Sequence, residues 1–172
     1  MLDLLMKRRS IRKYKDQEVE KEVLDKILKG ALTSPSSKNR RPWELIVVDH
    51  KEILEKLGDS RGAASRPVKN APLAIVVLGD PENSEIWVED ASIISTVIQL
   101  TAESLGLGSC WIQVRNRLTA DNESVEDYVK KALNIPEKYN VENMIAIGYP
   151  DEEKKPHDFE TLPYNKVHYN KF

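Results

Sequence analysis

Apolar residues recur along this chain with two periods that alternate. Between residues 19 and 31 they follow helical spacing, and a Ser-Pro-Ser-Ser stretch at 34–37 ends the segment. Short continuous apolar runs, which are typical of buried strands, occupy residues 43–48, 73–78, 109–113 and 143–148. Further helices are predicted over residues 51–57, 87–105 and 124–133. Helices that alternate with short strands predict a central sheet that is covered on both faces.

The helix predicted over residues 87–105 carries a wide apolar surface. One face is traced by Trp87, Ala91, Ile94, Ile98, Thr101, Ala102 and Leu105, and Ile93 and Val97 widen it. A surface this wide indicates burial on more than one side. Gly106 and Gly108 end the helix, because glycine readily adopts the left-handed conformation found at helix ends.

We expect a single domain over residues 1–172, because a chain of this length is too short for two independent cores. Its last segment, residues 151–172, is polar, contains Pro156 and Pro163, and is long for a tail without a role. An arm that wraps a partner subunit would account for this segment.

Composition and charge exclude several classes of protein. Hydrophobic residues make up 40% of the chain and charged residues 31%, as in ordinary globular proteins. A net charge of -2 gives no overall attraction to nucleic acid, and no apolar run approaches the roughly 18–20 residues that span a bilayer. We therefore expect a protein that binds neither nucleic acid nor membrane.

Cysteine and histidine are too sparse to indicate disulfides or metal sites. Cys110 is the single cysteine, which suits a reducing cytoplasm, and its apolar neighbours predict a buried, unreactive thiol. The histidines at 50, 157 and 168 are far apart and lack metal-ligand spacing. The first ten residues place apolar side chains before the basic ones, the reverse of a secretory signal. We expect a cytoplasmic protein without a metal site.

The first cluster with chemical potential is Arg8-Arg9-Ser10-Ile11-Arg12-Lys13-Tyr14. Several cations and a hydroxyl within a few residues can surround a phosphate, to which arginine makes bidentate, charge-assisted hydrogen bonds. A solvated basic patch is the plain alternative. A nucleic-acid patch is disfavoured, because no basic stripe with interleaved aromatic residues accompanies the cluster.

The second and third clusters are a polar loop and a glycine-rich turn. Residues 34–43, SPSSKNRRPW, place hydroxyl and amide groups between a helix and a strand, where a loop can aim them at a polar ligand. Residues 105–113, LGLGSCWIQ, put glycines after a helix and before a strand, the reverse of the dinucleotide-binding order. Glycines there would let a flat ring approach the backbone. Taken alone, however, the first segment is better explained as an ordinary loop and the second as a helix cap.

Taken together and in order, the three clusters resemble the nitroreductase family. The similar motifs are R-R-S-x-R-x-Y, S-P-S-S-x-N-x-x-P-W and G-L-G-S-C-W-I, within a match from about Met1 to Pro150 and a weaker echo at 167–169. The resemblance implies an α+β, nitroreductase-like fold, in which a central mixed β-sheet is flanked by helices. It also implies a homodimer with swapped segments and two flavins at its interface.

The resemblance also assigns cofactor-binding residues. Those implied to bind the FMN phosphate and ribityl chain are Arg8, Arg9, Ser10 and Arg12. Those implied to reach the flavin from the neighbouring subunit are Pro35, Ser36, Ser37 and Asn39. Those implied to lie against the isoalloxazine ring are Trp111, Ile112, Gln113 and Val114, with Arg66 as a cation near the flavin. No catalytic side chain is expected, because the flavin carries the chemistry.

The implied function is an FMN-dependent oxidoreductase that uses NAD(P)H to reduce small electron-poor acceptors, such as nitroaromatics and quinones, by a ping-pong mechanism. A flavin reductase, other flavin chemistry and a non-catalytic flavin-binding dimer are the alternatives. Two positions depart from the family pattern. Arg41 stands where the family usually has glutamine, and Glu160 stands where a basic residue is typical, with Lys154 and Lys155 upstream.

Overall fold

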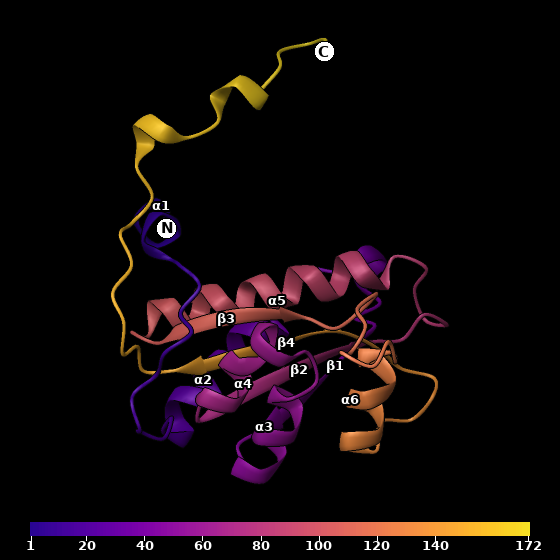
Figure 1. Ribbon diagram of the computed structural model, residues 1–172. Helices are drawn as coiled ribbons and strands as arrows, with labels where there is room; N and C mark the ends of the chain where they lie inside the picture. The colour runs from indigo at the N-terminus through magenta and orange to yellow at the C-terminus, as the bar shows by residue number, and fades with distance from the viewer.

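One antiparallel sheet forms the centre of the molecule, as the computed structural model of residues 1–172 shows (Figure 1). Its strands, in spatial order, are β1 (Trp43–Val48), β2 (Leu73–Gly79), β4 (Asn140–Gly148) and β3 (Gly108–Gln113). The four predicted strands are confirmed. The central strands β2 and β4 are almost wholly buried, and β1 and β3 form the edges of the sheet.

Helices cover both faces of this sheet. One face carries α2 (Lys21–Leu32) and α5 (Trp87–Ser104), and the other carries α3 (Lys51–Gly58), α4 (Arg66–Asn70) and α6 (Val125–Leu133). The short helix α1 (Leu2–Lys7) lies against α5. None of the helices combines the length and the apolar composition that crossing a bilayer requires.

Strand β2 shows why the core has two halves. Its seven residues are all buried, and alternate side chains point to opposite faces. Ile75 and Val77 pack with α2 and α5, whereas Ala74 and Val76 pack with α3, α4 and α6. A continuous apolar run is therefore the correct pattern for a strand that is covered on both sides.

The sheet was expected to be mixed, and its three strand pairs are instead all antiparallel. The mixed sheet was implied by the family resemblance. In this chain the connection through α3 and α4 leaves β1 and enters the neighbouring strand β2 at the same end of the sheet, which makes the pair antiparallel. Parallel pairing is limited to the single bridge between Ser10 and Ser109.

Strand β4 begins three residues before the predicted apolar run, and a β-bulge lies within this added part. The register against β2 shifts between Val77 and Leu78, so that Glu142 is the extra residue on the bulged strand. Polar side chains at 140, 142 and 143 interrupt the apolar pattern there, and Glu142 and Asn143 are nevertheless buried. Pairing by the backbone therefore extends the strand beyond the point where the side-chain pattern ends.

The C-terminal segment leaves the body of the molecule. In Figure 1 it is the yellow chain that rises past α1, with two short 3-10 turns at Phe159–Thr161 and Tyr164–Lys166. Its root is fixed by hydrogen bonds from the Asp151 N–H to the Lys13 carbonyl (3.0 Å) and from the His157 N–H to the Met6 carbonyl (2.8 Å). Beyond this root, the apolar side chains of Phe159, Tyr164, Val167, Tyr169 and Phe172 are exposed.

Gly79 tests the packing of α5 against the sheet. A Cβ at this position would overlap the indole ring of Trp87, at the start of α5. We expect Gly79→Ala to lower the free energy of unfolding by about 1–3 kcal/mol, the usual cost of overpacking. Urea unfolding measures this loss. In Trp87→Phe the benzo ring is absent, so the double variant should lose less stability than the sum of the two single variants.

Candidate functional site

The outer edge of β3 is covered at its two ends and open between them. At one end the Ile11 N–H donates to the Ser109 carbonyl at 3.0 Å, and Ser10 forms a parallel bridge with Ser109. This approach requires glycine at 108, where a Cβ would lie 2.7 Å from the Ile11 side chain. At the other end Nη1 of Arg61 donates to the Gln113 carbonyl at 2.9 Å.

Backbone groups line the open stretch of this edge. In an antiparallel pair, successive residues turn their N–H and C=O alternately toward and away from the partner strand. The backbone carbonyls of Ser109 and Gln113 accept hydrogen bonds on the side of β3 that faces away from β4. Trp111 is two residues from each of them, so its backbone N–H and carbonyl also point away from β4. The edge thus offers a backbone donor and a backbone acceptor to a ligand with polar atoms along its rim.

The four residues expected to lie against a flat ring divide into two pairs. Ile112 and Val114 have their side chains in the core, with exposures of 2% and 0%, and their backbone turns toward β4, where the Val114 N–H donates to the Glu142 carbonyl at 3.2 Å. Trp111 and Gln113 are partly exposed, and Trp111 Nε1 donates to Gln113 Oε1 at 2.8 Å. A ligand on this edge would therefore meet these two side chains.

A buried carboxylate fixes the Gln113 amide. Gln113 Nε2 donates to Glu142 Oε1 at 3.0 Å and to the Glu142 carbonyl at 3.1 Å, which leaves the amide oxygen to accept from Trp111. Glu142 is 4% exposed, and its second oxygen, Oε2, has no hydrogen-bond partner. The β4 bulge that carries Glu142 therefore positions the exposed end of β3.

The N-terminal basic residues lie beside the first residues of β3. Arg9 donates to the Lys155 carbonyl, and Arg12 Nη1 makes a long contact of 3.4 Å to the Ser10 carbonyl. No carboxylate forms an ion pair with Arg8, Arg9 or Arg12. Three guanidinium groups without a counter-ion can bind an anion without first breaking a salt bridge.

The root of the C-terminal segment completes this basic region. Glu152 accepts the backbone N–H of Arg12 at 2.6 Å and pairs with Lys154 at 2.7 Å, and these contacts lower the pKa of its carboxyl. A cavity of about 320 Å³ lies here, and Arg9, Lys154 and Gly108 are among its lining residues. Lys154 and Lys155 are thus near the basic cluster, whereas Glu160 lies farther out on the exposed arm.

The polar loop at 35–42 is held in a conformation that costs energy. Lys38, Asn39 and Arg41 have φ angles of 50°, 54° and 49°, and a non-glycine residue pays roughly 1 kcal/mol for each such angle. Hydrogen bonds offset this cost: the Arg41 N–H donates to Ser36 Oγ at 2.9 Å and Arg41 Nε donates to Asn39 Oδ1 at 3.0 Å. Arg41 therefore has a role inside the loop. Pro35 and Asn39 are exposed, and Ser36 and Ser37 are half-buried.

Asp90 attaches this loop to the first turn of α5. Its Oδ1 accepts the Ser37 N–H at 2.9 Å, and its Oδ2 lies 3.5 Å from the Ser84 hydroxyl. The carboxylate is only 2% exposed, and its place at a helix N-terminus favours the negative charge. Sequence patterns did not single out Asp90, although an acidic residue in a first helical turn followed by apolar neighbours was a usable signal.

Within one chain the loop and the basic cluster do not meet. The loop is attached to the first turn of α5. Glu103, in the last turn of α5, lines the 320 Å³ cavity together with Arg9 of the basic cluster. Because α5 has 18 residues, its ends are about 27 Å apart. The structure thus brings the basic cluster and β3 together, and it leaves Pro35, Ser36, Ser37 and Asn39 near the opposite end of the helix.

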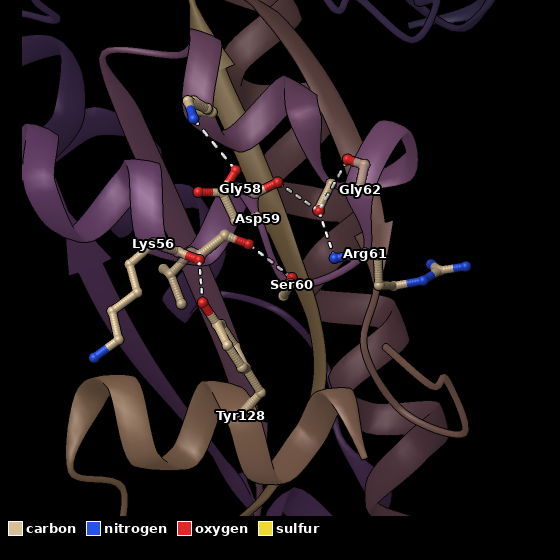
Figure 2. A network of polar contacts seen from close by, with 10 residues as sticks. Lys56, Gly58, Asp59, Ser60, Arg61, Gly62 and Tyr128 are labelled. Atoms are coloured by element: carbon tan, nitrogen blue, oxygen red, sulfur yellow. Dashed lines mark hydrogen bonds and ion pairs between the residues drawn. The ribbon is translucent and has the colours of Figure 1, made fainter. Parts of the chain in front are cut away.

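The middle segment supplies Arg61 to the edge of β3, and Figure 2 shows how its turn is built. Ser65 Oγ accepts the Arg61 N–H at 2.8 Å and donates to the Gly58 carbonyl at 2.7 Å, and Gly62 has a φ of 56° that favours glycine. Arg66, the cation expected near the flavin, is exposed at the start of α4 and forms no hydrogen bond or ion pair through its side chain. The sequence patterns did not identify Arg61, although Gly62 beside it indicates a tight turn at this position.

The remaining titratable residues add no second reactive centre. Burial raises the pKa of the Cys110 thiol, and its side chain packs in the core, as its apolar neighbours predicted. Tyr14 is buried against the sheet, where its hydroxyl donates to the Ile11 carbonyl at 2.6 Å and lies 3.3 Å from the Ala146 carbonyl of β4, and burial raises the Tyr14 pKa. No group of three or more His, Cys, Asp or Glu side chains is arranged to hold a metal ion.

Comparison with known proteins shows one consistent set of relatives. A family model described as the nitroreductase family matches residues 5–66 and 60–149. A protein of Methanothermobacter thermautotrophicus, provisionally named an NADH dehydrogenase/NAD(P)H nitroreductase, is 38% identical over 100% of this chain and 87% of its own length.

Solved structures agree with this assignment over the whole chain. The FMN-dependent nitroreductase of Clostridium difficile R20291 is 57% identical, with a TM-score of 0.97 and coverage of 100% of both chains. A protein of Parabacteroides distasonis, provisionally named an NADH dehydrogenase/NAD(P)H nitroreductase, is 34% identical, with a TM-score of 0.90 and coverage of 99% of this chain and 98% of its own.

Asp90 tests the attachment of the polar loop. Asp90→Ala removes the acceptor for the Ser37 N–H, and we expect the free energy of unfolding to fall by about 1–3 kcal/mol. Asp90→Asn keeps one acceptor oxygen and should recover part of that loss in urea unfolding. Glu89, exposed in the same helical turn, gives the control: Glu89→Ala should cost about 0.5 kcal/mol or less. Equal losses at 89 and 90 would contradict the anchoring role.

Proposed function

The chain belongs to the nitroreductase family, and on that basis we propose that it is an FMN-dependent oxidoreductase that takes electrons from NAD(P)H. The observation that carries this proposal is the open outer edge of β3, with unpaired arginines at one end and Arg61 at the other. A ligand that carries a phosphate at one end and a polar flat ring at the other matches this order of groups. FMN, when bound, supplies the hydride chemistry, while the protein supplies orientation and electrostatics.

The residues at the start of β3 fit the phosphate and ribityl chain. Arg8 and Arg12 have no carboxylate partner, and Ser10 adds a hydroxyl beside the strand. The Lys155 carbonyl accepts from Arg9, so the backbone of residue 155 lies beside the basic cluster, and we propose that the Lys155 ammonium group replaces the basic residue that position 160 lacks. We propose that Arg8, Arg9, Ser10 and Arg12 bind the phosphate, with Lys155 completing the site.

The rest of the β3 edge fits the ring. The outward backbone groups of Trp111 and Gln113 can hydrogen-bond the polar rim of the ring, whereas Ile112 and Val114, which turn toward β4 and the core, would support the strand behind the ring. The amide of Gln113 is fixed in one orientation by Glu142, so it meets the ring without losing further rotamer freedom. Arg61 is a cation that lies beside this strand, and we propose Arg66, at the start of α4, as a second cation near the ring.

We propose that the second part of each site comes from a partner subunit. Pro35, Ser36, Ser37 and Asn39 lie about one α5 length from the basic cluster of their own chain, so they would complete the site of the neighbouring chain. The exposed apolar residues of the arm at 151–172 would pack on that partner. These features support a homodimer in which segments are exchanged and both subunits build each flavin site.

The acceptors proposed are small electron-poor molecules, such as nitroaromatics and quinones, reduced by ping-pong kinetics in the cytoplasm. An edge site of this kind leaves one face of a bound ring for the donor and the acceptor in turn. The visible spectrum of the purified protein, before and after anaerobic NAD(P)H, tests the proposal. Flavin absorbance that bleaches is the expected result. A protein that is colourless and does not take up added FMN would contradict it.

Arg12 gives the sharpest mutational test of the phosphate site. Arg12→Ala removes a charge-assisted hydrogen bond to phosphate, and we expect FMN to bind more weakly by about 1.5–3 kcal/mol. The backbone contact of residue 12 to Glu152 remains, so the fold should persist. Lys15→Ala removes an exposed cation that makes no side-chain contact and serves as the control. Equal FMN affinity in the two variants, measured by fluorescence quenching of the flavin, would argue against the site.

A further inference from the structure

A carboxylate lies beside the place where the proposed function puts a phosphate. Glu152 lines the cavity of about 320 Å³ together with three cations, Lys7, Arg9 and Lys154. A negative charge at this position would by itself repel the phosphate of FMN. The contacts of the Glu152 side chain account for its presence in another way.

Glu152 continues a short pairing between the N-terminal segment and the root of the C-terminal arm. Tyr14 and Pro150 form an antiparallel bridge, and the Asp151 N–H donates to the Lys13 carbonyl at 3.0 Å. The pairing of the two backbones ends there. The next acceptor for the N-terminal segment is the side chain of Glu152, the residue that follows in the arm.

Both oxygens of this carboxylate are used. Oε1 accepts the backbone N–H of Arg12 at 2.6 Å and that of Lys13 at 3.2 Å, and Oε2 pairs with Lys154 Nζ at 2.7 Å. The contact with Lys154, followed by the contact with the Arg12 N–H, lowers the pKa of the Glu152 carboxyl. The charged form is therefore the one that these contacts stabilise.

These contacts leave the guanidinium group of Arg12 available. The nearby carboxylate bonds the backbone N–H of Arg12, while the guanidinium makes only the 3.4 Å contact to the Ser10 carbonyl. Because the rotamers open to a side chain depend on the φ and ψ of its own residue, a fixed backbone at residue 12 restricts where the guanidinium can point. Lys154 offsets the charge of Glu152, so that the carboxylate holds the segment without claiming a phosphate-binding arginine.

We propose that Glu152 is a positioning residue of the phosphate site. It holds the backbone of Arg12 and Lys13 against the root of the arm, and this directs the Arg12 guanidinium toward the ligand. Because Glu152 belongs to the arm, the root of the arm and the phosphate site form one unit. The inference rests on the proposed function, since FMN is the ligand whose phosphate Arg12 would bind.

Three substitutions at this position separate the reach of the side chain from its charge. Glu152→Ala removes the acceptor, and Glu152→Asp keeps the charge but shortens the side chain by a methylene group. Both should bind FMN about tenfold more weakly, the scale of a lost hydrogen bond to a charged group. Glu152→Gln keeps the length and one acceptor oxygen without the charge, and its affinity should stay within about threefold of the unaltered protein. Quenching of flavin fluorescence on adding FMN to the flavin-depleted proteins measures these affinities.

Glu153, the exposed neighbour in the chain, provides the matched control. Glu153→Ala removes an equal charge from the next position and should leave the affinity for FMN unchanged. Urea unfolding checks that each variant is folded. If Glu152→Ala does not fold, the contrast between Glu152→Asp and Glu152→Gln decides the question alone.

A role through charge alone predicts the opposite order. Without the repulsive carboxylate, Glu152→Ala and Glu152→Gln would bind FMN more tightly, and Glu152→Asp would match the unaltered protein. That order, or equal affinity in all the variants, overturns the inference. Failure of the proposed function is distinguishable from this result, because it would appear in the unaltered protein as no uptake of FMN or as bound flavin that NAD(P)H does not bleach.

Discussion

The length of α5 is the constraint on which the rest of the structure depends. Its buried face covers one side of the sheet, and its two ends are about 27 Å apart. Asp90 ties the polar loop to the first turn, while the basic cluster and the root of the C-terminal arm lie at the last. Helix packing thus both stabilises the fold and separates the two groups of residues that the proposed FMN site requires. A second chain is the simplest way to bring them together.

The edge of β3 gives the site its rigidity. An ordinary edge strand exposes unpaired backbone groups, which proteins usually cover to prevent unwanted strand pairing. Here Ile11 and Arg61 cover the ends, and the stretch around Trp111 stays open. The bulge in β4 places Glu142 behind this stretch, where its buried carboxylate fixes the Gln113 amide. Burying this carboxylate costs free energy, because one of its oxygens has no hydrogen-bond partner. The cost arises directly behind the surface that a ligand would contact, where a preorganised side chain favours binding.

Much of the fold could be predicted from the sequence, because burial determines it. The apolar runs of β2 and β3 and the wide apolar face of α5 identified these elements within a residue or two. The start of β4 and the antiparallel order depend on backbone pairing over long distances, which side-chain periodicity does not report. The basic cluster and β3 were proposed as ligand-binding segments from their motifs. Arg61, Asp90 and Glu142 were not, since each acts through a tertiary contact with Gln113 or Ser37 that no local pattern records.

The central claim is that each flavin site uses the basic cluster of one chain and the polar loop of the other, and hybrid dimers test it most directly. One chain carries Arg12→Ala and the other carries Ser37→Ala with Asn39→Ala, and each homodimer alone should bind FMN weakly. In a hybrid formed from differently tagged chains, one of the two sites would combine an intact Arg12 with an intact loop. The account predicts that tight FMN binding returns at one site per hybrid dimer. Hybrids that bind FMN as weakly as both parents would show that each chain builds its own site, and would contradict the account.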